Sequence, residues 1–107
     1  MTDRELLEAA AKAAGMPHTY NEFWSGFYIR NPDGSWVPNH HWNPLTDDGD
    51  ALRLMVSLRM NVHLDSNMVD VDPDGISWFS EAYGTDPHAA TRRAIVRAAA
   101  EIGRSKT

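Results

Sequence analysis

Residues 2–14 carry the hydrophobic pattern of an amphipathic helix. Its apolar positions recur at intervals of three and four residues and would share one face: Leu6, Leu7, Ala10, Ala13 and Ala14. Thr2 followed by Glu5 is typical of a capping box, in which each side chain accepts a hydrogen bond from an otherwise unpaired backbone N–H. Gly15 can adopt the left-handed conformation that ends a helix, and Pro17 prevents the helix from continuing.

Residues 22–42 are typical of β-structure. The segment 23–29 is rich in aromatic residues and contains Ile29, which favours a strand. Residues 31–34, with the sequence Asn-Pro-Asp-Gly, predict a tight turn, because proline presets φ, aspartate bonds back to the chain and glycine accepts a positive φ. Pro38 in the returning strand predicts a sheet edge or a bulge.

A second helix is expected to begin after Thr46 and to continue from Ala51 to about Leu58. Thr46 is a suitable N-cap for it. Acidic residues occupy the first turn, where they would interact favourably with the positive end of the helix dipole: Asp47, Asp48 and Asp50. The apolar residues near one face of this helix are Leu52, Met55 and Val56.

The C-terminal half repeats these signals. Residues 60–64 alternate between apolar and polar, as a half-buried strand does, and residues 67–83 predict a second hairpin that turns at Pro-Asp-Gly, residues 73–75. Asp86 and Pro87 are typical of the N-cap and first position of a helix. That helix is expected to run to about Ile102 and to end at Gly103, with one apolar stripe: Ile95, Val96, Ala99 and Ile102.

These elements predict one α+β domain over residues 1–107, built from antiparallel hairpins with three helices packed on the sheet. The size fits one domain. The two Pro-Asp-Gly turns are 41 residues apart, and each is followed within three residues by Ser-Trp. We interpret this spacing as a weak sign of a duplicated unit.

Composition excludes several classes of protein. Hydrophobic residues make up 42% of the chain and charged residues 23%, as in an ordinary globular domain. The chain has no cysteine, which excludes a disulfide scaffold, a thiolate zinc site and a cysteine nucleophile, and fits a reducing cytoplasm. Its apolar runs are far shorter than a membrane span, so no membrane association is expected.

The net charge of −5 argues against a partner that is polymeric nucleic acid. The distribution is uneven, because residues 87–107 contain one acidic residue, Glu101, and five basic ones: Arg92, Arg93, Arg97, Arg104 and Lys106. A small anionic ligand would find one favourable region on an otherwise repelling surface.

Metal and catalytic motifs are weak. Residues 70–81 match the calcium-loop pattern Asp-x-Asp-x-Asp-Gly followed by Glu81. Because strands rather than helices are expected on both sides, we interpret the pattern as a hairpin turn. The five histidines lack metal-ligand spacing, and the serines lack the glycines of a nucleophile elbow. No metal, no cofactor and no enzymatic activity are therefore expected.

The arginines of the last helix have two interpretations. Arg93 and Arg97 lie one turn apart, with Arg92 about 100° to one side. They either form a solvated helix face or grip the phosphates of a ligand through their guanidinium groups. Four tryptophans are many for so short a chain, and one at a strand end could stack on a base: Trp24, Trp36, Trp42 and Trp78.

Two stretches carry a resemblance to a known family. One is residues 42–54, Trp-Asn-Pro-Leu-Thr-Asp-Asp-Gly-Asp-Ala-Leu-Arg-Leu, and the other is residues 90–103, Ala-Thr-Arg-Arg-Ala-Ile-Val-Arg-Ala-Ala-Ala-Glu-Ile-Gly. The opening helix, from Glu5 to Gly15, also fits. In these stretches and in the order of its elements, the chain resembles the phage ABA-sandwich domain family of small phage and prophage proteins.

The resemblance implies an anti-defence role in the host cytoplasm. Members of that family include sponges that counter the Thoeris system by binding its cyclised ADP-ribose messenger intact, and some relatives bind cyclic oligonucleotides of the CBASS system. It implies a homo-oligomer whose Arg92 or Arg93 grips ligand phosphate, with Trp42, Asn43 and Arg53 as further ligand-binding residues. The stacking aromatic stays open among three residues: Trp78, Phe79 and Tyr28. A phage structural or protein-interaction module is the alternative, and a nucleotide hydrolase is a third possibility.

Overall fold

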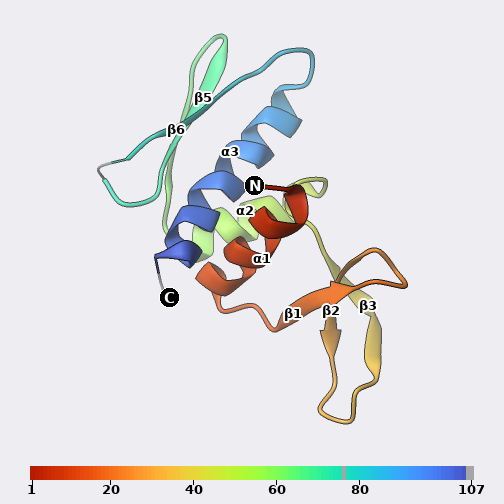
Figure 1. Ribbon diagram of the computed structural model, residues 1–107. Helices are drawn as coiled ribbons and strands as arrows, with labels where there is room; N and C mark the ends of the chain where they lie inside the picture. The colour runs from red at the N-terminus through yellow and green to blue at the C-terminus, as the bar shows by residue number, and fades with distance from the viewer. Residues whose placement is uncertain (76, 106–107) are drawn as a thin grey trace.

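A computed structural model describes residues 1–75 and 77–105 of the chain. Lys106, one of the five basic residues near the C-terminus, lies outside this part. The described chain contains three helices and six strands (Figure 1), in this order: α1 (Asp3–Ala14), β1 (His18–Asn21), β2 (Gly26–Arg30), β3 (Trp36–Trp42), α2 (Asp48–Ser57), β4 (Asn61–Leu64), β5 (Met68–Asp72), β6 (Phe79–Ala82) and α3 (Pro87–Arg104).

The strands form two separate antiparallel sheets of three strands each, in the orders β1-β2-β3 and β4-β5-β6. The expected α+β class, with antiparallel hairpins and three helices, is confirmed. The element order is one helix and three strands, repeated once and followed by α3. Both Pro-Asp-Gly turns lie between the second and third strand of their sheet, which supports the interpretation of a duplicated unit.

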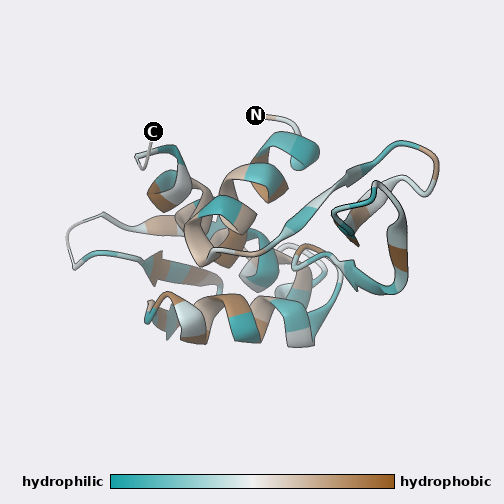
Figure 2. Ribbon diagram, turned by 90° about the horizontal axis from the view of Figure 1, so that it is seen from below, coloured by the Kyte–Doolittle hydropathy of each residue, from teal (hydrophilic) through white to brown (hydrophobic). Residues whose placement is uncertain are grey.

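Helix α3 lies at the centre of the molecule and packs against α1, α2, β5 and β6 (Figure 1). Its buried face consists mainly of alanines with Ile95 and Val96. Hydrophobic and hydrophilic residues lie on different sides of the helices (Figure 2), so burial of the hydrophobic sides forms the core. No helix in the described ranges has the length and apolar character that crossing a membrane would require.

The predicted caps of the outer helices are confirmed. The Thr2 hydroxyl accepts a hydrogen bond from the backbone N–H of Glu5, and the Glu5 carboxylate accepts one from the N–H of Thr2. Gly15 has a φ of 67° at the C-terminal end of α1. Asp86 caps α3 by accepting from the N–H of Ala89. These local signals suffice because each cap involves residues only three positions apart.

The boundaries of α2 and α3 differ from the prediction. The N-cap of α2 is Asp47, whose carboxylate accepts from the N–H of Asp50 at 2.8 Å, and not Thr46. Helix α3 continues through Gly103 to Arg104. A Cβ atom on Gly103 would lie 1.9 Å from the carbonyl oxygen of Ala9, so this glycine allows α1 and α3 to approach closely and does not end the helix.

The apolar face expected for α2 is largely exposed. Leu52 and Val56 are 56% and 62% exposed, whereas Ala51 and Leu54 are buried against the core. Helix α2 contacts α3, and Ala51 and Leu54 are the residues of α2 that are buried in the core. The apolar residues that the sequence places near one face are therefore not the ones that pack in the core, apart from Met55.

Strand β1 was not predicted, because its four residues carry little apolar pattern. It pairs with β2, where Tyr20 lies opposite Phe27, and the ring of Phe27 also contacts that of Trp42 on β3. Strand β3 is an edge strand, and its register with β2 shifts between Phe27 and Ile29. The edge position and the irregularity expected from Pro38 are both confirmed.

Candidate functional site

The turn between β3 and α2 is organised by Asn43. Its side-chain oxygen accepts a hydrogen bond from the N–H of Leu45 at 2.9 Å. Its carbonyl oxygen accepts from the N–H groups of Thr46, at 3.2 Å, and Asp47, at 2.9 Å. The adjacent Pro44 is fully buried. Asn43 therefore fixes the path of the chain from the end of β3 into α2.

Asp50 joins this turn to the outer surface of α2. Its Oδ2 accepts from the backbone N–H of Asn43 at 2.9 Å, and its Oδ1 accepts from Nη2 of Arg53 at 2.7 Å. The Asp50 side chain is 13% exposed, whereas that of Arg53 is 71% exposed. Asp50 thus brings together Asn43, its neighbour Trp42 and Arg53, three of the residues expected to bind ligand.

Sequence reasoning missed Asp50 as a site residue, because an aspartate in the first turn of a helix is explained by the helix dipole alone. Two observations indicate a further role for Asp50. Asp50 and Arg53 have the i, i+3 spacing of a helical ion pair. Asp47, and not Asp50, makes the capping hydrogen bond, which leaves the Asp50 carboxylate for its contacts with Asn43 and Arg53.

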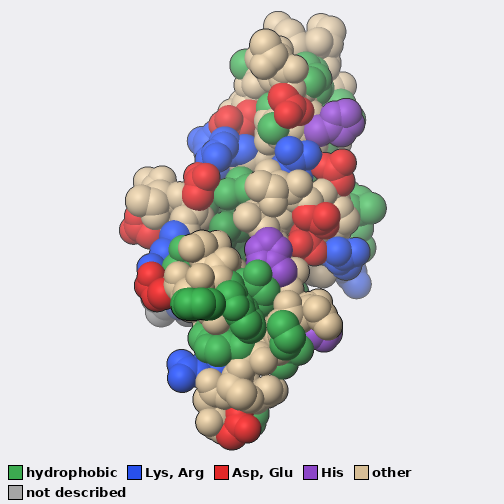
Figure 3. Space-filling view, turned by 90° about the vertical axis from the view of Figure 1, so that its right-hand side faces the viewer, with side chains coloured by type: hydrophobic (Ala, Val, Ile, Leu, Met, Phe, Trp, Pro, Cys, Tyr) green, Lys and Arg blue, Asp and Glu red, His purple; other side chains and the backbone are tan. Residues whose placement is uncertain are grey.

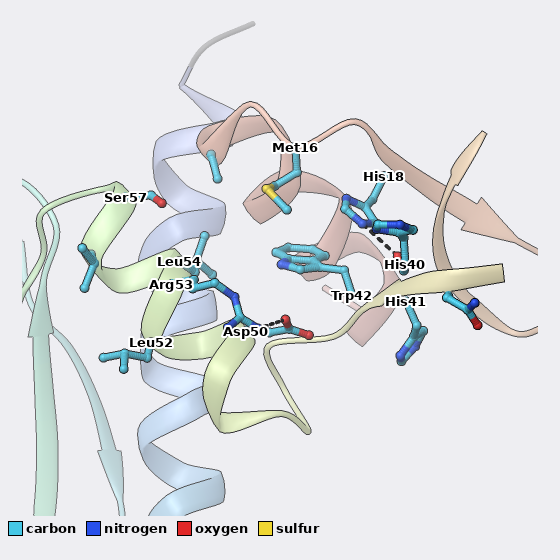
Figure 4. A pocket seen from close by; sticks show the side chains of 13 residues that line it. Met16, His18, His40, His41, Trp42, Asp50, Leu52, Arg53, Leu54 and Ser57 are labelled. Atoms are coloured by element: carbon cyan, nitrogen blue, oxygen red, sulfur yellow. Dashed lines mark hydrogen bonds and ion pairs between the residues drawn. The ribbon is translucent and has the colours of Figure 1, made fainter. Parts of the chain in front are cut away.

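A cavity of about 580 Å³ opens beside this cluster. Its walls come from the segment after α1, the end of β3 and the exposed side of α2 (Figure 4). Figure 4 shows the Trp42 ring between Met16 and Asp50, with Arg53 reaching from α2 towards the Asp50 carboxylate. His18, His40 and His41 line the cavity on the strand side, and Leu52 and Val56 line it on the helix side.

His18 is held in one tautomer at the cavity wall. Its Nε2 lies 2.9 Å from the carbonyl oxygen of His40. Because a carbonyl only accepts, Nε2 carries the proton of the neutral ring and Nδ1 is left as an acceptor. Nδ1 is buried and has no hydrogen-bond partner in the described structure. Burial lowers the pKa of His18 below its ordinary value, which favours the neutral ring.

The cavity combines apolar and ring surfaces with one accessible cation. Within the described chain, Arg53 uses only Nη2 for hydrogen bonding, so Nε and Nη1 remain available for an anion. The Trp42 ring is 4% exposed and packs 6.0 Å from the His18 ring, measured between centroids. Trp42 therefore supports the wall of the cavity and does not project into solvent. This arrangement suits a ligand with a flat apolar part and an anionic part.

Arg92 acts on the same turn from its opposite side. Its Nε donates to the carbonyl oxygen of Leu45 at 2.8 Å, and its Nη1 donates to Asp48 at 2.6 Å. Its side chain is only 16% exposed. Arg92 does not line the cavity that Arg53 lines. It lines a neighbouring apolar groove between α2, β4 and α3. The structure therefore places Arg92 where it positions residues 43–48.

Arg93 and Arg97 lie on another side of α3. Arg93 donates to Asp3 at 3.2 Å, and Arg97 forms an ion pair with Glu81 and donates to the carbonyl oxygen of Ser80. Both line a hollow of about 360 Å³ that Arg104 also lines. The structure thus brings Arg93 and Arg97 together and separates Arg92 from them, so the three do not form a single clamp.

None of the three candidate stacking aromatics lines the cavity beside Arg53. Trp78 is 53% exposed. Phe79 lies under the guanidinium of Arg97, 5.7 Å from ring centroid to Cζ. Tyr28 contacts Trp24 and His41 on the first sheet. A ring that stacks on a ligand in this cavity must therefore belong to one of the residues of the cavity wall.

The calcium pattern belongs to the second hairpin, as expected. Oδ1 of Asp72 accepts from the N–H groups of Asp74, at 3.1 Å, and Gly75, at 2.6 Å, which closes the turn. Strands β5 and β6 flank it. Within residues 1–75 and 77–105, no histidine and carboxylate side chains cluster in the way that a metal site requires.

Comparison with known proteins leaves the family of the chain open. The chain matches no protein family model. It is similar to no curated protein and to no solved structure at a significant level.

Proposed function

We propose that this protein binds a nucleotide-derived messenger without degrading it, as the sponges that its sequence resembles do. The cavity beside Arg53 is the proposed site. The observation that carries the proposal is the cluster of Trp42, Asn43, Asp50 and Arg53, in which a rigid turn holds an accessible guanidinium beside a ring-lined cavity. The proposed ligand is the cyclised ADP-ribose of Thoeris or a cyclic oligonucleotide of CBASS.

The chemistry of the cavity supports such a ligand. A guanidinium donates charge-assisted hydrogen bonds to phosphate oxygens, and Nε and Nη1 of Arg53 are each available to donate one. The adjoining rings and the apolar side chains Leu52 and Val56 offer surface for a base or ribose. The group that would bind phosphate and the surface that would bind the base or ribose lie side by side, because the Arg53–Asp50 pair anchors the guanidinium at the edge of the cavity.

Affinity sets a further requirement. A messenger at low concentration needs a dissociation constant of about 1 nM, which is about −12 kcal/mol. An arginine that is 71% exposed contributes only a fraction of this. We therefore propose a homo-oligomer in which a second subunit covers the cavity, and the exposed Leu52 and Val56 at its edge provide apolar surface for that contact.

The test is calorimetric titration with cyclised ADP-ribose and with a cyclic trinucleotide, using NAD and linear ADP-ribose as controls. The bound protein is then heat-denatured and the released ligand is analysed by chromatography. Tight binding with intact release supports a sponge. Release of an altered ligand overturns the proposal in favour of an enzyme.

The alternative is a phage protein-interaction module without a small ligand. One observation favours it: the groove on the other side of α2 is almost entirely apolar, and Leu64 at its edge is 65% exposed. This alternative predicts no calorimetric signal with any of the four nucleotides and a defined complex with one phage protein in pull-down.

A further inference from the structure

The first sheet presents an exposed aromatic surface that shares only His41 with the lining of the proposed site. Phe23 is 91% exposed and Trp24 is 38% exposed, and both lie in the turn between β1 and β2. The Trp24 ring contacts that of Tyr28 at 4.8 Å, and Tyr28 contacts His41 at 5.1 Å, measured between centroids. Figure 3 shows hydrophobic side chains gathered over this sheet, in its lower half.

The turn that carries Phe23 and Trp24 is held in place. The side-chain oxygen of Asn21, a residue that is only 6% exposed, accepts from the N–H of Trp24 at 2.8 Å. Ser25 completes the turn with a φ of 52°, in the left-handed region that serines rarely adopt. A buried polar anchor and a strained backbone thus keep two large apolar side chains in solvent.

Gly26 leaves room for the ring of His41. A Cβ atom on Gly26 would lie 2.9 Å from two atoms of the His41 ring and 3.2 Å from the Tyr28 ring. The His41 ring therefore lies directly over the backbone of β2 and beside Tyr28. Side chains on β2 and β3 form one continuous ring surface with Trp24.

One cation borders this surface. Cζ of Arg30 lies 5.2 Å from the centroid of the Trp36 ring, and Nε of Arg30 donates to the carbonyl oxygen of Gly34. Within the described ranges Arg30 has no carboxylate partner, whereas Glu22, which lines the same hollow, is paired with Arg4. The hollow between Arg30, Trp36, Phe23 and Trp24 measures about 580 Å³. Its unpaired charge is complementary to an acidic group.

We propose that this surface, formed by Phe23, Trp24, Tyr28, Trp36 and His41 with Arg30 at its border, docks an extended proline-containing peptide that carries an acidic residue. Prolines in the polyproline II conformation pack between exposed aromatic rings and lose little conformational entropy on binding. The acidic residue of the peptide pairs with Arg30. A polyanion such as single-stranded nucleic acid fits less well, because Arg30 alone offers it little attraction on a chain of net charge −5.

The test is an NMR and fluorescence titration of the full chain with a short proline-rich peptide that contains one central aspartate. The matched peptide carries lysine in place of the aspartate, and an oligothymidylate of similar length is the third probe. Saturable binding of the aspartate peptide is expected, with shifts confined to residues of this surface. Replacement of the aspartate by lysine is expected to weaken binding by about tenfold.

Variants identify the contact. Phe23→Ala and Arg30→Gln both change exposed side chains, so the fold is expected to persist, as circular dichroism would verify. Each is expected to weaken binding by about fivefold or more. Arg59→Gln, an equal charge change after α2, is the control and is expected to bind normally. No saturable binding, equal binding of both peptides, tighter binding of the oligothymidylate, or normal binding by Phe23→Ala would each overturn the proposal.

Discussion

Nε of Arg92 donates a hydrogen bond to the carbonyl oxygen of Leu45 at 2.8 Å, although the two residues are 47 positions apart. Nη1 of the same guanidinium pairs with Asp48 at the start of α2. Arg92 therefore ties α3 to the turn that carries Asn43. On the opposite side of this turn, Asp50 holds Arg53 at the edge of the cavity. One mostly buried arginine thus supports the geometry that a second, exposed arginine offers to a ligand.

Arg92→Ala is expected to lower the free energy of unfolding by about 2–3 kcal/mol, because it removes a hydrogen bond and an ion pair at a mostly buried position. Arg93→Ala is expected to cost less than about 1 kcal/mol, because the Arg93–Asp3 pair is exposed. Urea unfolding of both variants measures the difference. Equal losses of stability would contradict the structural role of Arg92.

Gly103→Ala is expected to destabilise the protein, although alanine favours a helix more than glycine does by about 1 kcal/mol. The added methyl group would overlap the carbonyl oxygen of Ala9 and force α1 away from α3. A net loss of about 1–3 kcal/mol in the free energy of unfolding is expected. The matched control is Glu101→Ala on the exposed side of the same helix, which should be nearly neutral. A stabilised Gly103→Ala variant would show that the two helices are not in close contact.

His18 makes stability dependent on pH. Burial lowers its pKa below 6.5, with His40 and His41 acting in the same direction and the hydrogen bond to His40 and the charge of Asp50 opposing them. The unfolded chain therefore binds the proton more readily than the folded chain does. The stabilisation is present above pH 6.5 and is lost as pH falls through that value towards the lower pKa of the folded state.

The comparison of wild type with His18→Gln isolates this effect. The glutamine amide can still donate to the carbonyl oxygen of His40 but does not titrate. Thermal unfolding between about pH 7 and pH 5 is expected to show a smaller fall in Tm for the variant than for wild type. Parallel curves for the two proteins would mean that another group produces the pH dependence.

The exposed side of α2 is expected to form the subunit contact. Leu52→Asp combined with Val56→Asp places two charges on side chains that contribute little to the core of one subunit. Sedimentation is expected to show an oligomer for wild type and a monomer for the double variant, with unchanged circular dichroism. An oligomer that survives both substitutions would place the contact elsewhere.

Elements with local signals could be predicted from the sequence. The caps at Thr2 and Asp86 and the turns at Pro32 and Pro73 each depend on a few consecutive residues, and the structure contains them all. Strand β1 could not be predicted, because only its pairing with β2 defines it. The role of Gly103 depends on Ala9, which is distant in sequence.

The candidate site, too, has features that the sequence could predict and features that only the packing of the chain defines. Trp42, Asn43 and Arg53 could be named from the resemblance of residues 42–54, and the structure places them around one carboxylate. The separation of Arg92 from Arg93 and Arg97 depends on what packs around α3. Leu45 and Asp48 meet one side of the helix, whereas Asp3 and Glu81 meet another. Helical spacing gives the angle between these arginines but not their partners.

Binding of the cyclised ADP-ribose messenger and the cyclic trinucleotide by wild type, Arg53→Gln and Arg59→Gln tests the central claim most directly. Both variants remove one positive charge from an exposed side chain near α2, and only Arg53 lines the cavity. Wild type and Arg59→Gln are expected to bind one messenger equally, and Arg53→Gln is expected to lose about 1.5–3 kcal/mol of affinity, which is at least tenfold. Unchanged binding by Arg53→Gln, or loss on substitution of Arg93 instead, would contradict the assignment of the site to this cavity.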